Sequence, residues 1–359
     1  MPFITGTTSL RASLRFLHLG IAALALAAGA AAQSQVIDAT VHSPGLERNL
    51  LGDPADQTIA IYLPDVYRKQ PQRRLPVLYF LHGYSDPTSR HDAGQLFQNL
   101  MDQLIARSLA PPMIVVLPNG LNKYKGAFYA NSSTTGNWDD YIVRDVVGYV
   151  DKNFRTQAAV AHRGIAGHSM GGYGALTLAF RHPDVFSSVY AMSPCCTDLV
   201  GDLGPSNPAW EQVNQLDSPD EVPRALSQHE FFVAAMSALD AALAPDPKAK
   251  TLGDAPFYLQ HKQVKTNAEA YSRISTKLPA NMVRPLLANI QQLRGIFIEY
   301  GAQENFTHIP IGAQEVSREL SEAGVPHTLE IFEGDHVDHL VQRIGERMLP
   351  WMAKQLNGE

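Results

Sequence analysis

The sequence predicts an α/β fold built on a mostly parallel sheet of about eight strands, with helices on both faces. Short apolar runs alternate with helix-like segments along most of the chain, which is the pattern of strand–helix–strand units. Of the 359 residues, 45% are hydrophobic and 18% are charged, an ordinary globular profile. A serine flanked by glycines stands between one strand-like run and one helix-like run, where such a sheet exposes its edge.

The expected strands are short apolar or alternating runs bounded by turn residues. They cover residues 36–41, 58–63, 75–81, 113–117, 162–166, 187–191, 295–300 and 327–332, of which the first is the weakest. Five segments with helical periodicity lie between or after them, at residues 93–109, 140–154, 171–181, 311–323 and 337–356. We therefore expect one sheet whose strands are connected mainly by helices.

The alternation stops between residues 197 and 293. This stretch opens with glycine and proline turns and then predicts helices at residues 227–243, 268–278 and 281–293, with one extended piece at 252–261. Because the strand pattern resumes at residue 295, we interpret the stretch as an insertion within a single domain over residues 33–359. We expect it to form a lid or one wall of a cleft at the carboxyl edge of the sheet. A helical decoration without a role is the alternative.

The first 32 residues resemble a secretory signal peptide. Arg11 and Arg15 precede an apolar run over residues 17–28, and Ala30–Ala31–Ala32 supplies a small-residue cleavage site, so we expect cleavage after Ala32. A buried N-terminal helix is the alternative. The apolar run is too short to span a bilayer comfortably, and no later segment resembles a membrane span. We therefore expect a secreted or periplasmic protein with no integral membrane segment after cleavage.

The charge balance argues against nucleic acid as a partner. Cleavage would remove two arginines and no acidic residue, so 29 Lys plus Arg become 27 against 35 Asp plus Glu, and the formal net charge goes from −6 to −8. A chain with this net charge has no general attraction to nucleic acid or anionic membranes.

The only two cysteines, Cys195 and Cys196, are adjacent. A trans peptide holds neighbouring Cα atoms about 3.8 Å apart, whereas ordinary disulfides prefer about 4.4–6.8 Å. We therefore expect two buried thiols. No histidine stands at metal-ligand spacing from them, so the sequence predicts no metal site.

Residues 167–171 read Gly-His-Ser-Met-Gly and match G-x-S-x-G at a strand-to-helix junction, the context of a nucleophilic serine. A sharp turn there projects the Ser169 hydroxyl out of the sheet. We expect Gly167, Gly171 and Gly172 to remove crowding and to tolerate unusual backbone angles. The N-terminus of the following helix favours developing negative charge. A purely structural glycine-rich turn is the alternative.

A serine hydroxyl needs a base within hydrogen-bond reach and a group that orients the base. On this architecture the partners follow in the order serine, acid, histidine, on loops after later strands. Glu304 is the only carboxylate in the loop at residues 301–306, and His336 lies in the turn directly beyond the 327–332 strand. His339 is the alternative base, but we expect it to lie a turn into the next helix.

Asp335 and Asp338 are alternatives for the acid. Their proximity in sequence to His336 lets them reach only poorly around the imidazole to the side away from the serine.

The oxyanion formed during attack needs two backbone amides aimed at it. We expect one from Met170, directly after the nucleophile. The other should come from Tyr84, in the loop after the 75–81 strand, where Gly83 lets the backbone turn. Four neighbouring residues are candidates to line the substrate pocket: His82, Gly83, His168 and Trp138, the last of which core packing would explain equally well.

With these motifs the chain resembles an α/β-hydrolase of the esterase D type, the group that includes S-formylglutathione hydrolases, feruloyl esterase domains and mycolyltransferases. The matching stretches are residues 61–64, 75–83, 137–155, 164–191, 295–304 and 332–336, which span most of the chain outside the insertion. The resemblance implies Ser169 as nucleophile, Glu304 as acid and His336 as base. It also implies Tyr84 and Met170 as the oxyanion hole and no metal or organic cofactor. The family more often has aspartate at the acid position, although glutamate also occurs there.

We therefore expect a secreted serine carboxylesterase that acts on small-molecule or polymer-linked esters through an acyl-enzyme on Ser169. Acyl transfer of the mycolyltransferase type, with the same triad, is one alternative. A catalytically inactive extracellular binding module on the same fold is the other. Export disfavours formylglutathione, a cytosolic thioester, as the substrate. No residue of the 197–293 insertion identifies the acyl or alcohol group.

Overall fold

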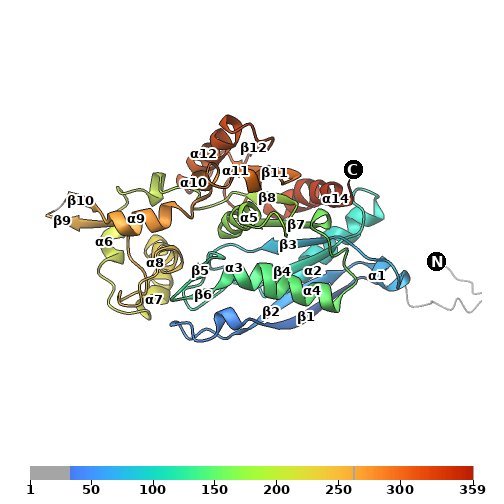
Figure 1. Ribbon diagram of the computed structural model, residues 1–359, viewed down its shortest axis with the longest axis horizontal. Coiled ribbons are helices and arrows are strands. Elements are labelled where there is room, and N and C mark those ends of the chain that lie inside the picture. Colours follow the sequence, from blue (N-terminus) through green and yellow to red (C-terminus); the bar gives the residue numbers. More distant parts are fainter. Residues whose placement is uncertain (1–32, 262, 359) are drawn as a thin grey trace, which may run out of the picture. The chain divides into compact units, whose positions relative to one another are not determined.

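The computed structural model describes residues 33–261 and 263–358, so the expected signal peptide lies outside the described residues. The described chain forms an eight-stranded sheet with the order β1-β2-β4-β3-β7-β8-β11-β12 (Figure 1). These strands are β1 (Gln35–His42), β2 (Asp56–Leu63), β3 (Val77–Leu81), β4 (Ile114–Pro118), β7 (Arg163–His168), β8 (Ser188–Met192), β11 (Gly295–Gly301) and β12 (Thr328–Phe332). All eight predicted strands are confirmed.

The sheet is mostly parallel, as expected. The pairs β1–β2 and β2–β4 are antiparallel, and every pair from β4 to β12 is parallel. Parallel strands place their carboxyl ends at one edge, where the loops after β3, β7, β8, β11 and β12 meet. That edge is where an α/β sheet holds its functional side chains.

The helices form two layers, one on each face of the sheet. The helices outside the insertion are α1 (Asp65–Lys69), α2 (Arg90–Ala106), α3 (Trp138–Asp140), α4 (Val147–Asn153), α5 (Met170–Arg181), α12 (His308–Glu322), α13 (Leu340–Arg343) and α14 (Leu349–Asn357). A π-helical turn, η2 (Tyr141–Val146), joins α3 to α4, and another, η5 (Ile344–Met348), joins α13 to α14. Three short 3₁₀ turns are η1 (Pro44–Leu46), η3 (Val160–His162) and η4 (Gly201–Leu203).

A hydrophobic core lies between the sheet and each helix layer. There are two cores because successive strand residues point to opposite faces of the sheet. On β2, Ile59 and Ile61 join the core under α3, α4, α5 and α12. Ala60 and Tyr62 join the core under α2 and α14. The buried strands therefore carry apolar residues on both sides, which explains why they stood out as continuous apolar runs.

Two helix boundaries differ from the expected ones for local reasons. The last helical segment begins at Leu340 and not at residue 337, because the Asp335 carboxylate accepts the backbone N–H groups of Val337 and Asp338, each at 2.9 Å. Such a turn competes with helix formation. The helix expected at 93–109 runs from Arg90 to Ala106, since Ser89 caps its start by accepting the N–H of Asp92.

The insertion between residues 197 and 293 is mainly helical. It contains α6 (Ala209–Val213), α7 (Glu221–Ser227), α8 (Phe231–Leu243), α9 (Ala268–Ser275), α10 (Pro279–Met282) and α11 (Leu287–Ile290), with a hairpin of β9 (Phe257–Gln260) and β10 (Gln263–Thr266). Its α8 packs against β5 (Asn131–Ser132), which pairs with β6 (Gly136–Asn137) (Figure 1). No helix within residues 33–261 and 263–358 has the length and apolar character to cross a membrane.

Candidate active site

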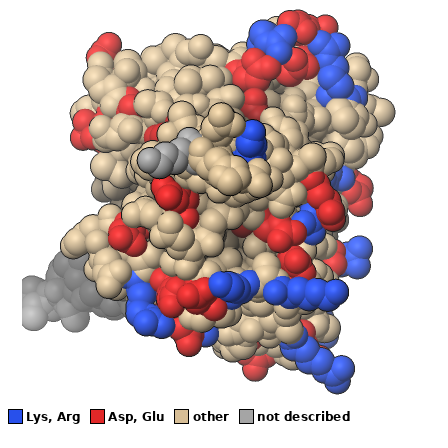
Figure 2. Space-filling model, turned by 90° about the vertical axis from the view of Figure 1, so that its left-hand side faces the viewer, with Lys and Arg blue, Asp and Glu red and all other residues tan. Residues whose placement is uncertain are grey.

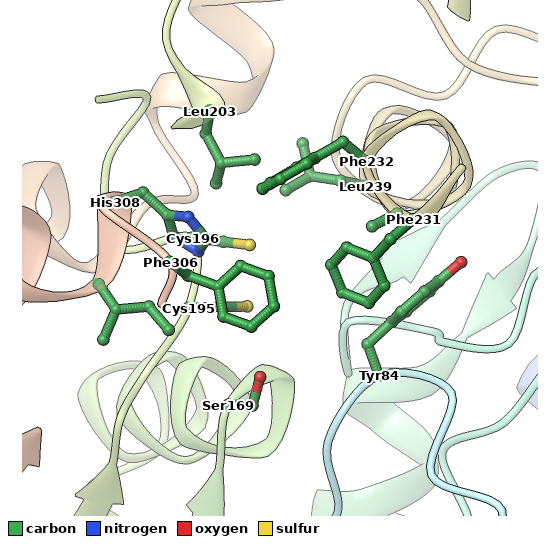
Figure 3. Close-up of a pocket in the computed structure, with 12 residues that line it drawn as sticks. Tyr84, Ser169, Cys195, Cys196, Leu203, Phe231, Phe232, Leu239, Phe306 and His308 are labelled. Carbon is green, nitrogen blue, oxygen red and sulfur yellow. The ribbon is translucent and has the colours of Figure 1, made fainter. Parts of the chain in front are cut away.

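Ser169 lies in the sharp turn between β7 and α5. Its backbone has φ 57° and ψ −118°. Residues other than glycine rarely adopt this conformation, and it stores strain. The hydroxyl points away from the sheet into a pocket that Cys195 and Phe306 also line (Figure 3). The structure thus places the Ser169 hydroxyl on a sharp turn at the wall of a cavity.

The glycines around Ser169 act through close approach. A Cβ atom at Gly171 would overlap the carbonyl oxygen of Leu81, and one at Gly167 would overlap the carbonyl oxygen of Gly171. Neither glycine has a positive φ. Their expected tolerance of unusual backbone angles is not used here, because Ser169 itself carries the unusual angle. The glycines instead let β3 pass close to the turn.

Glu304 and His336 form a direct contact. The Nδ1 atom of His336 lies 3.0 Å from Oε1 and 3.1 Å from Oε2 of Glu304. The Glu304 side chain is 1% exposed and that of His336 is 11% exposed. The loops after β11 and β12 carry them, and parallel pairing of these strands sets the loops side by side. The Nδ1–H group donates to the carboxylate, so Nε2 is the nitrogen left to accept a proton.

The alternative acids and the alternative base lie, like His336, in the loop between β12 and α13. The Asp335 carboxylate accepts hydrogen bonds from the backbone N–H groups of its own turn. His339 directly precedes α13 and lines a separate cavity with Arg343 and Glu346. Among the candidates, Glu304 is the carboxylate that contacts the His336 imidazole.

Ser169 and His336 line the same cavity, a groove of about 530 Å³ at the carboxyl edge of the sheet. Within the described residues, no hydrogen bond joins the Ser169 hydroxyl to the imidazole. Catalytic contacts of this kind are often long in ligand-free structures and tighten when substrate binds. The structure therefore places Ser169 and the His336–Glu304 pair at one groove.

The two amides expected to bind an oxyanion flank the serine. A Cβ atom at Gly83 would lie 3.4 Å from the Cβ atom of Ser169, so the loop after β3 runs directly beside the nucleophile. Met170 opens α5. Neither the Tyr84 nor the Met170 amide donates a hydrogen bond within the part of the chain that the structure describes. Both are free to donate to an anionic oxygen.

His82 holds the loop after β3 in place through two hydrogen bonds. Its Nε2 accepts the N–H of Gly120 at 2.8 Å, so Nδ1–H donates to the carbonyl of Gly83 at 2.8 Å. Burial lowers the pKa of His82 to about 4, so the ring is neutral at ordinary pH. Both His82 and Gly83 line the groove.

His168 also lines the groove. Burial, with a smaller effect from His336, lowers the pKa of His168 to about 3. Trp138, in contrast, is fully buried, donates its indole N–H to the carbonyl of Thr135 at 2.8 Å and packs edge-on against Tyr141. It is not among the residues that line either cavity at Ser169, so the structure favours the packing alternative.

A second cavity, here called the narrow pocket, meets the groove at Ser169 and encloses only about 30 Å³. It is almost entirely apolar, and its residues are Tyr84, Ser169, Cys195, Cys196, Leu203, Phe231, Phe232, Ala235, Leu239, Phe306, His308 and Ile309 (Figure 3). Phe231, Phe232 and Leu239 come from α8 of the insertion. His336 lines the groove but not the narrow pocket.

One cluster beside Ser169 was not predicted from the sequence. Cys195 and Cys196 are free and buried, which confirms the expected thiols. His308, the first residue of α12, lies beside them. Burial alone would raise the pKa of Cys195, but Cys196 and His308 beside it lower the value overall. Burial alone would lower the pKa of His308, but Asp202 and Cys195 raise it overall. No sequence spacing signals this cluster, because its members come from distant loops.

The face of the molecule that carries the insertion has no dominant charge. Figure 2 shows basic and acidic side chains interspersed there, with uncharged side chains over most of the middle of the view.

The chain is similar to known esterases in sequence and in structure. A family model described as "Putative esterase" matches residues 54–251. Esterase Rv1288 of Mycobacterium tuberculosis (strain ATCC 25618 / H37Rv) is 30% identical over 215 residues, which are 53% of this chain and 43% of that protein. The chain thus spans less than half the length of that curated relative.

Solved structures show the same architecture. A ferulic acid esterase superposes with a TM-score of 0.62 at 21% identity, covering 90% of this chain and 98% of that one. The S-formylglutathione hydrolase from Agrobacterium tumefaciens superposes with a TM-score of 0.55 at 18% identity, covering 91% and 97%. At these identities the likeness shows the fold alone, which is the expected α/β-hydrolase fold.

Proposed function

The chain belongs to this esterase family, and we propose that it is an exported serine carboxylesterase whose nucleophile, acid and base are Ser169, Glu304 and His336. The observation that carries the proposal is the paired contact of His336 with the buried Glu304 carboxylate, in a groove that Ser169 also lines. A strained serine and an acid–base pair, carried by three separate loops, have no structural need to meet at one groove.

The proposed reaction follows from these roles. His336 Nε2 takes the proton of the Ser169 hydroxyl as its oxygen attacks the ester carbonyl carbon, and the Tyr84 and Met170 amides bind the resulting oxyanion. The imidazolium then gives this proton to the departing alcohol oxygen, which leaves an acyl-enzyme. Water, deprotonated by His336, releases the carboxylic acid and restores the serine. The Glu304 carboxylate orients the His336 imidazole and stabilises it whenever it carries the proton.

The two cavities suggest how the ester lies. The departing alcohol must reach the proton on His336, and His336 lines the groove. We therefore assign the alcohol to the groove and the acyl group to the narrow pocket. A space of about 30 Å³ corresponds to about two or three waters, since one water needs about 10–15 Å³ of such volume, and this is about the size of an acetyl group. The proposed substrates are esters of acetyl-sized acids with larger, mainly apolar alcohols.

A panel of p-nitrophenyl esters of rising acyl length, with methyl ferulate and acetylated sugars beside it, tests this assignment. We expect kcat/KM to be highest for acetate and to fall steeply with acyl length, with methyl ferulate poor. Ser169→Ala is the inactive control for the whole panel. A preference for feruloyl or long acyl groups would contradict the assignment, and product analysis with an added alcohol separates hydrolysis from acyl transfer.

A matched pair of variants locates the two groups. Phe232→Ala enlarges the narrow pocket and should shift the preference toward longer acyl chains. Val341→Ala changes the groove, which Val341 lines, and should leave the acyl preference as it was. The same shift in both variants, or in neither, would contradict the proposed orientation.

The export part of the proposal rests on the basic, apolar and small-residue order of residues 11–32. Expression of the full chain in a secreting bacterium should yield mature protein that begins at Gln33. Retention of uncleaved protein in the cytosol would contradict it.

A further inference from the structure

Cys195, Cys196 and His308 form a cluster on one side of the narrow pocket, here called the Cys-Cys-His cluster (Figure 3). One ligand atom from each residue, a sulfur or an imidazole nitrogen, lies within 4.8 Å of the others. All three residues are buried. Two thiols and an imidazole gathered in an apolar wall are donors that the proposed ester hydrolysis does not use.

His308 is oriented as metal-binding histidines commonly are. Its Nδ1 atom is paired with the carboxylate of Asp202. Asp202 is itself held by the backbone N–H groups of Thr307 and His308, each at 3.0 Å. A carboxylate on one ring nitrogen fixes the tautomer and leaves the lone pair of the other nitrogen for a metal. Here that other nitrogen, Nε2, is buried and has no hydrogen-bond partner within the described residues.

We propose that the Cys-Cys-His cluster binds a thiophilic divalent cation, Zn²⁺ by its donor chemistry. Cys195, Cys196 and His308 Nε2 would be the ligands, Asp202 would orient the imidazole, and the fourth position would open on the narrow pocket. Two thiolates and an imidazole suit Zn²⁺ and not Mg²⁺ or Ca²⁺, which prefer oxygen ligands. Three protein ligands with one open position are also a coordination that Zn²⁺ adopts in proteins.

The distances fit such an ion after a small adjustment. Zn–S and Zn–N bonds of about 2.3 and 2.0 Å in tetrahedral geometry set ligand atoms about 3.5–3.8 Å apart. The present limit of 4.8 Å therefore has to shrink by about 1 Å, which side-chain rotation at two cysteines and a histidine can supply. Binding also displaces the protons held by the ligand atoms, those of the thiols and that of His308 Nε2, so affinity should fall as the pH is lowered.

An ion at this place would compete with substrate. The narrow pocket that we assign to the acyl group is lined by the same Cys195, Cys196 and His308 side chains and by Ser169. Occupancy of the fourth position should therefore inhibit ester hydrolysis. This consequence rests on the proposed function, whereas metal binding itself does not.

Titration of the reduced, purified protein with Cd²⁺, a spectroscopic substitute for Zn²⁺, tests the site. We expect ultraviolet thiolate-to-metal absorption that saturates at one ion per chain and is displaced by Zn²⁺. Cys195→Ser, Cys196→Ser and His308→Gln should each lose stoichiometric binding. Asp202→Asn keeps the three ligands and should weaken affinity about 10–100-fold. His339→Gln, which removes an imidazole outside the cluster, should bind like the unmodified protein.

Melting curves without metal show which variants are folded, and the titration of the unmodified protein is decisive even if some are not. No saturable absorption in that protein would overturn the proposal. Absorption that persists unchanged in folded Cys196→Ser or His308→Gln would overturn it too, because two of the three proposed ligands would then be enough to hold the ion.

Measuring inhibition by Zn²⁺ distinguishes the proposed metal site from the proposed ester hydrolysis. Zn²⁺ should slow hydrolysis by the unmodified protein and by His339→Gln, but should leave Cys196→Ser near its own metal-free rate. Equal inhibition of Cys196→Ser would place the inhibiting ion outside the Cys-Cys-His cluster and contradict the link to catalysis. If no ester is hydrolysed at all, the proposed function fails, and the Cd²⁺ titration of Ser169→Ala still tests the metal site.

Discussion

The Nε2 atom of His168 lies 2.8 Å from the backbone carbonyl oxygen of His336. Burial holds the pKa of His168 down to about 3, so the ring is neutral and its Nε2–H donates to this carbonyl. The residue directly before the proposed nucleophile therefore holds the loop that carries the proposed base. This contact fixes the position of the His336 loop relative to the Ser169 turn, as the proposed proton transfer requires.

Removal of this contact should affect turnover more than binding. His168→Leu leaves the His336 carbonyl without its donor, which costs about 1–3 kcal/mol of unfolding free energy, and we expect kcat to fall while KM changes little. His168→Gln keeps an N–H donor and should recover part of kcat. Steady-state kinetics and urea unfolding check both variants; an unchanged kcat in His168→Leu would show that the contact does not position the base.

The backbone strain at Ser169 should be measurable as stability. Ser169→Gly and Ser169→Ala both remove the hydroxyl, but only glycine accepts φ 57° and ψ −118° without strain. A strain of about 1–3 kcal/mol, less the extra entropy that glycine gains on unfolding, leaves Ser169→Gly about 1 kcal/mol more stable than Ser169→Ala. Urea unfolding with matched slopes measures the difference. Equal stability of the two variants would argue against a strained turn.

Arg343 compensates a carboxylate in the core of the sheet. Glu299 on β11 is fully buried, accepts the hydroxyl of Tyr190 at 2.6 Å and pairs with Arg343. Arg343→Met leaves that charge without its ion pair and should lower the unfolding free energy by about 3–5 kcal/mol. Arg347, 51% exposed and paired with Glu330, is the control: Arg347→Met should cost about 0–1 kcal/mol. Similar costs for both would mean that burial of Glu299 does not set the penalty.

Asp240 on α8 should make stability depend on pH. Burial raises the pKa of its carboxyl well above the usual range, and neither oxygen has a hydrogen-bond partner among the described residues. The folded chain keeps this proton while the unfolded chain loses it above about pH 4, so the unfolding free energy falls as pH rises from there toward the raised pKa. Asp240→Asn removes this loss, and its stability relative to the unmodified protein should grow with pH.

Thermal melts at pH 5 and pH 8 measure the effect. The exposed Asp184→Asn, away from the insertion, is the control and should leave the pH dependence unchanged. A constant difference between Asp240→Asn and the unmodified protein at the two pH values would contradict a protonated Asp240.

The strands and the serine turn could be predicted because their physical requirements are local. A strand buried on both faces needs a continuous apolar run, and the turn at Ser169 needs glycines where β3 passes. Glu304 and His336 could be placed because chain order puts them directly after β11 and β12. The start of α13 at Leu340 was missed because it depends on the Asp335 side chain, which sequence periodicity does not register.

Long-range contacts could not be predicted. α6 and α7 lie in a stretch rich in proline and glycine, and their short apolar faces are set by packing against α8. Cys195 follows β8 and His308 opens α12, so only the folded sheet brings them together. The division of the site into a groove and a narrow pocket depends likewise on where α8 places Phe231 and Phe232.

The most direct test of the central claim is peptide mapping after reaction with a fluorophosphonate probe, which forms a covalent adduct with an activated serine. We predict one adduct per chain, on Ser169, with none in Ser169→Ala, whose kcat should be lower by about 10⁴-fold or more because triad members act as a unit. His336→Ala should react far more slowly. An adduct on another residue, or no adduct beside measurable ester hydrolysis, would contradict the assignment of Ser169 as the nucleophile.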